Sequence, residues 1–277
     1  MHEELALANR EHSLSGVDLR LGYHGVTVVH GAAIGLRRGV VTALVGPNGS
    51  GKSTLLRALA RLHPIEAGMV HLADGATAGS LPAREFARRV TLLAQSRPVP
   101  SGVTVRDVVG YGRHPYRGRW RADDPNGPAA VTRAMDVTGV AAMADRPVDE
   151  LSGGELQRVW LATCLAQETP VLLLDEPTTF LDLRYQVEIL DLVRDLADDH
   201  DVAVGVVLHD LNQAAAVADE VVLLHNGRVR ATGTPAAVFT ADALSETYGI
   251  RIEVTADPVS GVVTTRPVGR HLARTPI

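Results

Sequence analysis

The chain has 277 residues, a formal net charge of −5 and 45% hydrophobic residues, values that are ordinary for a globular protein. The acidic charge argues against general nucleic-acid binding, and no apolar run approaches the roughly 18 residues that a membrane-spanning helix needs. The N-terminus lacks a secretory signal pattern, and the one cysteine, Cys164, has no intrachain disulfide partner, which fits a reducing cytoplasm. Any role at a membrane is therefore expected to depend on a partner.

The first part of the chain predicts an antiparallel sheet. Residues 17–23 alternate between apolar and polar side chains like a half-buried strand, and residues 26–30 and 32–36 predict two further short strands. Tyr23 ends the first strand, where a tyrosine ring suits stacking on a nucleobase and covering a strand surface equally well.

A glycine-rich motif follows an apolar run at residues 40–45. Residues 46–54 match the phosphate-binding pattern G-x-x-x-x-G-K-[ST] in full, between a predicted buried strand and a helix over residues 55–60. In that context backbone N–H groups and the positive end of the helix bind phosphate oxygens. The nucleotide-binding residues predicted here are Gly46, Pro47, Asn48, Gly49, Ser50, Gly51, Lys52, Ser53 and Thr54.

Lys52 is the only lysine in the chain, and the other strongly basic side chains are arginines. A narrow phosphate cradle accepts the compact ammonium of lysine and excludes the planar fork of arginine. We therefore expect Lys52 to reach the β- and γ-phosphates of a nucleotide, and the Ser53 hydroxyl to bind Mg²⁺.

The sequence pattern changes after a predicted strand at residues 90–95, which ends in Gln95. Residues 96–165 show no strand signal and predict a helical insertion, with a capping box at residues 104–107 and a helix at residues 128–139. Residues 110–121 are aromatic, basic and rich in glycine. A short loop of this kind is more typical of a protein contact than of a nucleic-acid surface.

A second capping box, Ser152 with Glu155, begins a helix that extends to about residue 167. Gly153 and Gly154 stand just inside its start, where each costs roughly 1 kcal/mol of helix stability. Bare backbone N–H groups at the positive end of a helix allow an anion to approach closely. The sequence therefore predicts an anion contact here, beside the simpler reading of a well-capped helix.

Two further buried strands end in polar side chains. Residues 171–174 lead into Asp175 and Glu176, and residues 202–208 lead into His209. Ligands in open α/β sheets bind at the carboxyl ends of strands, so Asp175 is suited to hold Mg²⁺ and Glu176 to take a proton from water. The rest predicts a long helix from residue 178 to 198, a hairpin around residues 226–227 and weak strand signals after residue 250.

Together these motifs resemble the ATP-binding cassette (ABC) ATPase family over about residues 15–250. The resemblance rests on Tyr23, residues 46–54, Gln95, the run Leu151-Ser152-Gly153-Gly154-Glu155-Leu156-Gln157-Arg158, residues 171–177, Phe180-Leu181-Asp182 and His209. It implies an α/β fold with a phosphate-loop (RecA-like) core, an antiparallel β-subdomain and the helical insertion. It divides the chain into an ATPase domain at residues 14–250, with the helical subdomain at about 96–165, and a C-terminal tail at 251–277.

The resemblance also implies roles for single residues. The adenine would stack on Tyr23, and the ATP-hydrolysing set would be Lys52, Gln95, Glu176 and His209, with Mg²⁺ held by Ser53, Gln95 and Asp175. The signature residues Ser152, Gly153, Gly154 and Glu155 would contact the γ-phosphate held by a second copy in a head-to-tail dimer, and Asp182 belongs to the D-loop between the copies. Glu155 stands where many members have Gln.

A narrower resemblance concerns the ATPases of ferric-siderophore, haem and vitamin B12 importers. It rests on residues 103–116, 209–214, 248–250 and 257–261. It implies ATP hydrolysis that drives import, with siderophore uptake favoured over haem or vitamin B12. The expected partners are membrane permease subunits and, indirectly, an extracytoplasmic substrate-binding protein. The subunit would lie peripherally on the cytoplasmic face of the membrane.

Three other functions compete with import as explanations of these motifs. ABC proteins of DNA repair or translation need a long coiled-coil insertion or a second cassette, which this sequence lacks. A GTPase needs a base-reading Asn-Lys-x-Asp motif, which is impossible because the only lysine lies in the phosphate loop. Export is the third alternative, and the residues of the helical insertion argue only mildly against it.

Overall fold

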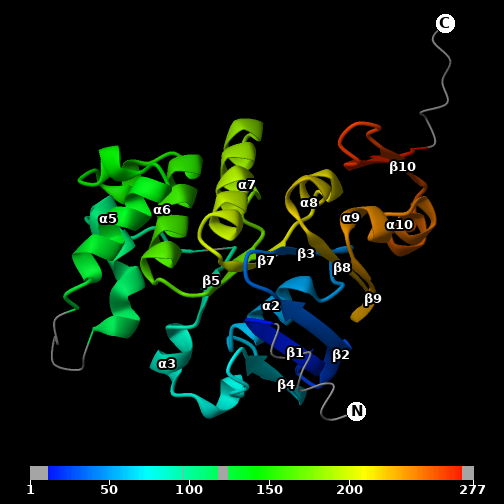
Figure 1. Cartoon of the computed structure of the whole chain (residues 1–277), viewed down its shortest axis with the longest axis horizontal. Coiled ribbons are helices and arrows are strands. Elements are labelled where there is room, and N and C mark those ends of the chain that lie inside the picture. The colour runs from blue at the N-terminus through cyan, green and yellow to red at the C-terminus, as the bar shows by residue number, and fades with distance from the viewer. Residues whose placement is uncertain (1–11, 96, 118–123, 270–277) are drawn as a thin grey trace, which may run out of the picture.

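A computed structural model of the chain describes residues 12–95, 97–117 and 124–269. Its centre is a six-stranded sheet in the order β5-β6-β7-β3-β8-β9 (Figure 1). All neighbours in this sheet are parallel except the hairpin of β8 and β9. The strands span β3 Val41–Val45, β5 Val90–Leu93, β6 Val171–Asp175, β7 Ala203–Val207, β8 Glu220–His225 and β9 Arg228–Gly233.

The central strands are apolar on both faces because both faces are covered. Along β6, Leu172 and Leu174 pack into one core cluster, while Val171 and Leu173 pack into another on the opposite face. This alternation follows the two-residue period of a strand. The first cluster includes side chains of α6 Gly153–Ala166, α7 Leu183–Asp198 and α8 Leu211–Val217, and the second includes those of α2 Lys52–Leu59.

An antiparallel sheet of three strands packs against α2 on the side away from α7 (Figure 1). Its strands are β1 Leu14–Tyr23, β2 Val26–Leu36 and β4 Ala67–Leu72. The two short strands expected within residues 26–36 form one long strand instead. Gly31, at a φ of 72°, lies opposite a register irregularity in β1, so the pairing with β1 bends there without ending.

A group of helices lies between β5 and β6 in the sequence and to one side of the sheet (Figure 1). It comprises α4 Val105–Gly110, η3 Tyr111–Tyr116, α5 Gly127–Val137, η4 Ala141–Met143, η5 Val148–Glu150 and the helix α6. The group has its own apolar cluster, centred on Val108, Met135 and Val159. Both predicted capping boxes are present, at the starts of α4 and α6. These features confirm the predicted fold class.

The aromatic and basic loop predicted as a contact surface is partly turned inward. Arg113 is 2% exposed; it donates to Asp124, to Glu168 and to the carbonyl of Ala166, with its guanidinium over the Tyr116 ring. This part of the loop therefore joins η3 to the end of α6. Residues 118–123 of the loop lie outside the described residues.

The C-terminal part is more regular than expected. It contains α9 Pro235–Val238, α10 Ala241–Tyr248 and a hairpin of β10 Ile252–Ala256 and β11 Val263–Pro267. Ile252 and Val263 are buried in the same core cluster as α7 and α8. The remaining short elements are η2 Ala78–Ser80 and α3 Ala83–Ala87. Within the described residues no helix is long and apolar enough to cross a membrane.

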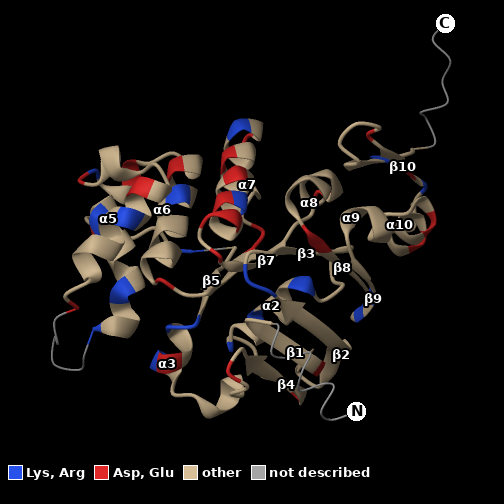
Figure 2. Ribbon diagram, viewed as in Figure 1, with Lys and Arg blue, Asp and Glu red and all other residues tan. Residues whose placement is uncertain are grey.

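Charged side chains are few on the central strands and numerous on the helices (Figure 2). On α7 both signs are interspersed, and the ion pairs Arg184–Glu188 and Arg194–Asp198 join positions four residues apart. Pairs of this spacing support a helix on its solvent side.

Candidate nucleotide-binding site

The order of the parallel strands determines which side chains meet. Strands β5, β6, β7 and β3 are consecutive neighbours, and the chain leaves their carboxyl ends toward Gln95, Glu176, His209 and the glycine loop respectively. These four features therefore lie in a row along one edge of the sheet.

The glycine loop joins β3 to α2 in a conformation that side chains would prevent. At Gly46 an added Cβ would lie 2.1 Å from the carbonyl oxygen of Leu224. Gly51 caps α2 with a φ of 100°, a left-handed conformation that favours glycine. Ser50 is 3% exposed and its hydroxyl has no hydrogen-bond partner among the described residues. The loop is thus a tight backbone cradle with an unsatisfied donor, which fits a phosphate ligand.

Lys52 is 5% exposed and lies inside this loop. Its ammonium donates to the carbonyl oxygens of Gly46 at 2.8 Å and Pro47 at 3.0 Å. Burial lowers the pKa of Lys52, and the nearby carboxylates of Glu176 and Asp175 oppose that shift. The loop's own carbonyls therefore hold the ammonium at the place where phosphate oxygens would compensate its charge.

Asp175 is a carboxylate with 1% exposure at the end of β6. It accepts a hydrogen bond from the Ser53 hydroxyl at 2.6 Å and pairs with Arg57 at 3.1 Å. The hydroxyl and carboxylate oxygens are the hard donors that Mg²⁺ prefers, so this pair fits the predicted metal. Sequence reasoning missed Arg57, although it lies one helical turn after Ser53 and hence on the same face of α2.

Glu176 is held by neighbours on three sides. Its Oε1 lies 2.5 Å from Nε2 of His209, and its Oε2 accepts hydrogen bonds from the Gln95 amide and, at 3.3 Å, from the Thr179 hydroxyl. The carboxylate is thus fixed in orientation at the strand edge, close to the glycine loop. This is the arrangement expected of a general base.

A cavity of about 370 Å³ connects these groups. Its walls include Lys52, Ser53, Gln95, Glu176 and His209. Its size lies in the range of small-ligand pockets. Further lining residues are Val28, Asn48, Gly49, Gly51 and Thr54.

Tyr23 is not among the residues lining this cavity. Tyr23 is 42% exposed, and its ring packs against His63 with 4.5 Å between ring centroids. Stacking of Tyr23 on a nucleobase therefore stays a prediction.

The signature residues lie on the start of α6 and do not line the cavity either. Ser152 accepts from the backbone N–H of Glu155, and the Glu155 carboxylate accepts from the N–H of Ser152. A Cβ on Gly154 would meet the Tyr185 ring at 2.3 Å, whereas one on Gly153 would meet nothing within 4 Å. Gly153 thus faces open space. Asp182, the D-loop residue, caps α7 by accepting from the N–H of Tyr185 at 3.2 Å.

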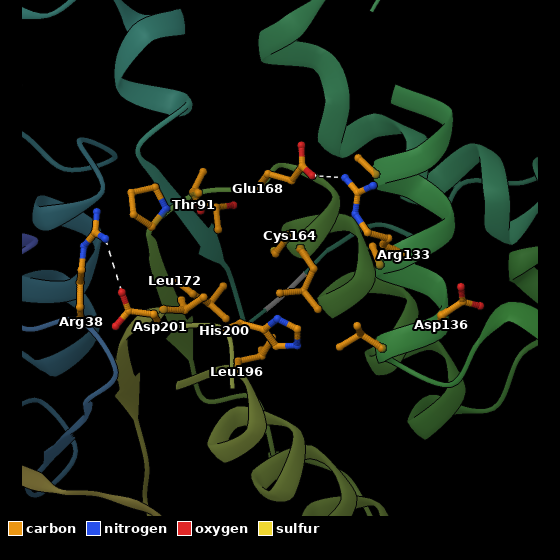
Figure 3. A pocket seen from close by; sticks show the side chains of 17 residues that line it. Arg38, Thr91, Arg133, Asp136, Cys164, Glu168, Leu172, Leu196, His200 and Asp201 are labelled. Carbon is orange, nitrogen blue, oxygen red and sulfur yellow. Dashed lines mark hydrogen bonds and ion pairs between the residues drawn. The ribbon is translucent and has the colours of Figure 1, made fainter. Parts of the chain in front are cut away.

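A larger cavity, of about 670 Å³, lies away from this site (Figure 3). It opens near the amino-terminal ends of β6 and β7, with α5 and the end of α6 as its other wall. Its lining is mainly apolar, and its rim carries the ion pairs Arg38–Asp201 and Arg133–Glu168. Because the site residues all follow the carboxyl ends of their strands, this cavity is not the nucleotide site.

Gln157, on the signature helix α6, makes a connection that sequence reasoning missed. Its amide donates to the carbonyl of Pro177 at 2.8 Å and accepts from Arg97 at 3.2 Å. Burial lowers the pKa of Arg97 to about 10. Gln157 thus joins the signature helix to the segments that follow Glu176 and Gln95.

The parallel sheet, the glycine loop before α2 and the acidic end of β6 define a phosphate-loop nucleotide-binding protein. The model of the ABC transporter family matches residues 29–179, more than half of the chain. The chain belongs to the ABC transporter family.

Two relatives and one solved structure show how far the similarity extends. The chain is 43% identical over 260 residues to the ferric enterobactin transport ATP-binding protein FepC of Escherichia coli (strain K12), covering 93% of this chain and 94% of that one. It is 47% identical over 249 residues to the hemin import ATP-binding protein HmuV of Streptomyces coelicolor, covering 90% and 88%. It also matches a chain from an inward-facing structure of a transporter described as of the metal-chelate type, with a TM-score of 0.80, 25% identity and coverage of 93% and 98%.

Proposed function

We propose that this chain is the ATP-hydrolysing subunit of an ABC importer that takes up iron(III)-siderophores. The observation that carries the hydrolytic role is the Glu176 carboxylate, oriented by Gln95 and His209 beside the glycine loop that holds Lys52. The cargo is proposed from the 43% identity to the ferric enterobactin transport ATP-binding protein FepC. Such a carboxylate suits the removal of a proton from a water molecule that attacks a γ-phosphate.

Each residue of the edge then has a task in hydrolysis. The loop N–H groups and Lys52 bind the phosphates, Glu176 takes the proton of the attacking water, and His209 and Gln95 keep Glu176 in place. Mg²⁺, when bound by Ser53, Asp175 and Gln95, supplies neutralisation of the phosphate charge. The Ser53 hydroxyl can hold the ion through a lone pair of its oxygen while its proton still donates to Asp175.

The proposed partners follow from where the signature residues lie. Because Ser152, Gly153, Gly154 and Glu155 do not line the cavity of their own chain, they are free to contact nucleotide held by a second copy. Asp182 would lie between the two copies. Membrane permease subunits would contact the helical subdomain, and an extracytoplasmic binding protein would deliver the cargo. The subunit would occupy the cytoplasmic face of the membrane, without binding nucleic acid.

The domain limits proposed here are residues 14–250 for the ATPase domain, with about 96–165 as its helical subdomain, and 251–277 as a C-terminal segment. The apolar cluster of the helical group, separate from the two clusters on the main sheet, supports the inner division.

Glu176→Gln tests the hydrolytic role. The amide keeps the shape of the side chain but cannot accept the proton, so ATP binding should persist while turnover falls by about 100-fold or more. The variant should accumulate as an ATP-bound dimer in size-exclusion chromatography, with the wild-type protein as the reference. Steady-state hydrolysis at the wild-type rate would exclude Glu176 as the base.

Haem import is the second candidate, because the identity to the hemin import protein HmuV is 47% over 249 residues. Vitamin B12 import is the remaining alternative. Purified binding protein from the same transport system should separate them, because it holds the cargo directly. Tight binding of a ferric siderophore, and none of haem or cobalamin, is expected; preference for haem would overturn the cargo assignment alone.

A further inference from the structure

Two segments with no role in the hydrolytic proposal are in contact. Asn212 lies in the first turn of α8, three residues after His209, and Thr265 lies in β11, 53 residues further along the chain. Asn212 Oδ1 accepts from the Thr265 N–H at 2.7 Å and from its hydroxyl at 3.1 Å. Asn212 Nδ2 donates to the Thr265 carbonyl at 3.2 Å. We call this set of three hydrogen bonds the Asn212–Thr265 clasp.

The hairpin is built to hold Thr265 in place. The Asp257 carboxylate closes its turn by accepting from the N–H groups of Val259 at 3.0 Å and Ser260 at 2.7 Å. Ile252 and Val263 bury its base in the core. Thr265 itself is 6% exposed. A two-stranded hairpin is marginal by itself, so this anchoring gives the clasp a fixed end.

Helix α8 needs anchors because it has only seven residues. Helices of that length are not stable by themselves, so their position depends on tertiary contacts. Gln213 supplies one anchor, since its amide accepts from Thr178 at 3.0 Å and donates to Gln186 at 2.8 Å on α7. Asn212 supplies the other on the opposite side, and Figure 1 shows α8 between α7 and the β10–β11 hairpin.

The position of His209 depends on the same segment. Its side chain is 43% exposed and contacts Glu176, so apart from that pair its place is determined by the backbone between β7 and α8. Asp210 caps α8 by accepting from the N–H groups of Asn212 at 2.7 Å and Gln213 at 3.2 Å. A shift of α8 would therefore move His209 directly.

We propose that Asn212 is a positioning residue for ATP hydrolysis, and that the β10–β11 hairpin acts through the Asn212–Thr265 clasp to hold His209 against Glu176. The inference deepens the proposed function and rests on it for the identity of the reaction. It gives the C-terminal segment a task in the site, although this segment carries none of the ATP-hydrolysing residues.

Asn212→Ala removes all three hydrogen bonds from an exposed position, so the fold should survive. In steady-state hydrolysis, kcat should fall about tenfold while KM for ATP stays within about twofold, because a displaced His209 affects the reacting geometry more than binding. Asn212→Asp keeps the two accepting interactions and should lose less. Thr265→Val removes the hydroxyl alone and should cost about twofold. Thr264→Val makes the same change at the neighbouring exposed position and should match the wild type.

A double-mutant cycle separates positioning from general stability. In the His209→Ala background, Asn212→Ala should change kcat by less than about twofold, since the residue through which it acts is gone. An additive loss would overturn the inference, as would equal effects of Thr264→Val and Asn212→Ala.

Hydrogen exchange gives a readout that needs no ATP. In Asn212→Ala the amides of residues 210–213 should exchange about tenfold faster than in the wild type, while those of β3 stay unchanged. Unchanged exchange at residues 210–213 would refute the clasp even if hydrolysis were altered. An inactive wild-type chain would instead count against the proposed function.

Discussion

Glu176 combines a chemical position with an unusual backbone. Its φ of 55° is left-handed, which costs a residue other than glycine about 1–3 kcal/mol. Phe180, four residues later, is also left-handed at 65° and is 98% exposed. The backbone therefore turns sharply twice between β6 and α7, and the first turn aims the Glu176 carboxylate along the sheet edge toward Gln95 and His209.

Lys52→Arg tests whether the cradle recognises the shape of its cation. The Lys52 ammonium lies between two loop carbonyls in a space that a planar guanidinium would not fit, so nucleotide affinity should fall at least tenfold although the charge is retained. Calorimetric titration with ATP measures the loss. Arg57→Lys serves as a comparison, because Arg57 is also on α2 but pairs with Asp175 and does not line the cavity. Wild-type affinity in Lys52→Arg would refute the steric argument.

Cys164 gives a pH dependence of stability. Burial raises the pKa of its thiol to about 11, against an ordinary value of 9.0. Between pH 9 and 11 the unfolded chain loses this proton first, so the free energy of unfolding should fall by up to about 2–3 kcal/mol as pH rises through that window. Burial also raises the pKa of Tyr248, to about 12, which acts in the same direction above pH 10.

Urea unfolding at pH 8, 9, 10 and 11 checks the cysteine contribution. Cys164→Ala should lower stability at pH 8, because a buried side chain is shortened, but it should flatten the decline above pH 9. Parallel declines in the two proteins would show that the thiol contributes nothing.

At the scale of elements, Arg113 joins η3 to the end of α6. Arg113→Ala would leave the Asp124 carboxylate, whose side chain is 10% exposed, without its charged partner. We expect a loss of about 3 kcal/mol or more of unfolding free energy, as for other broken buried pairs. Arg106→Ala removes an exposed pair with Asp145 in the same helical group and should cost less than about 1 kcal/mol. Equal losses of unfolding free energy in the two variants, measured by urea unfolding, would contradict a special role of the buried Arg113 pair.

The elements show which sequence signals were sufficient. Buried parallel strands, the glycine loop and the capping boxes are encoded by a few adjacent residues, so they were predicted. The predicted start of α7 was wrong. The helix begins at Leu183, with Asp182 as its cap, and not at residue 178. The two left-handed residues that delay it depend on the surrounding fold. The helix α10 was likewise not foreseen, and the strands β10 and β11 gave only weak signals in the sequence, because the support of these elements comes from the distant core.

The same distinction holds within the site. Gln95, Glu176 and His209 could be placed at one sheet edge, since each follows a recognisable strand and parallel strands end on the same side. Contacts between residues that are distant in the sequence could not be predicted, because no local sequence pattern encodes them. The pair of Arg57 with Asp175 and the bridge from Gln157 to Pro177 each join segments that only the tertiary structure brings together.

Gly153 allows a test of whether two copies of the chain together form each nucleotide site. A methyl group there meets nothing within 4 Å of its own chain and suits the first turn of a helix, so Gly153→Ala should raise stability by up to about 1 kcal/mol and leave ATP binding by one copy unchanged. If a second copy's nucleotide packs against this backbone, hydrolysis and ATP-dependent dimerisation should fall at least tenfold.

Gly154→Ala is the contrasting variant, because its methyl group would clash with Tyr185 inside the same chain and should lower stability as well. Sedimentation in the presence of ATP measures dimerisation, and thermal unfolding without ATP measures stability. Together they distinguish Gly153→Ala from Gly154→Ala. Undiminished hydrolysis by Gly153→Ala would argue that each copy works alone.

The single lysine has a consequence for covalent chemistry. Neutral amines attack acylating reagents and aldehydes, and the only side-chain amine of this sequence is the one inside the phosphate cradle. Burial lowers the pKa of Lys52, which favours the reactive neutral form, while its 5% exposure restricts access. The other strongly basic side chains are arginines, which stay protonated and do not react in this way. Apart from the terminal amine, an amine-directed label would therefore report on the nucleotide site, and bound nucleotide would protect it.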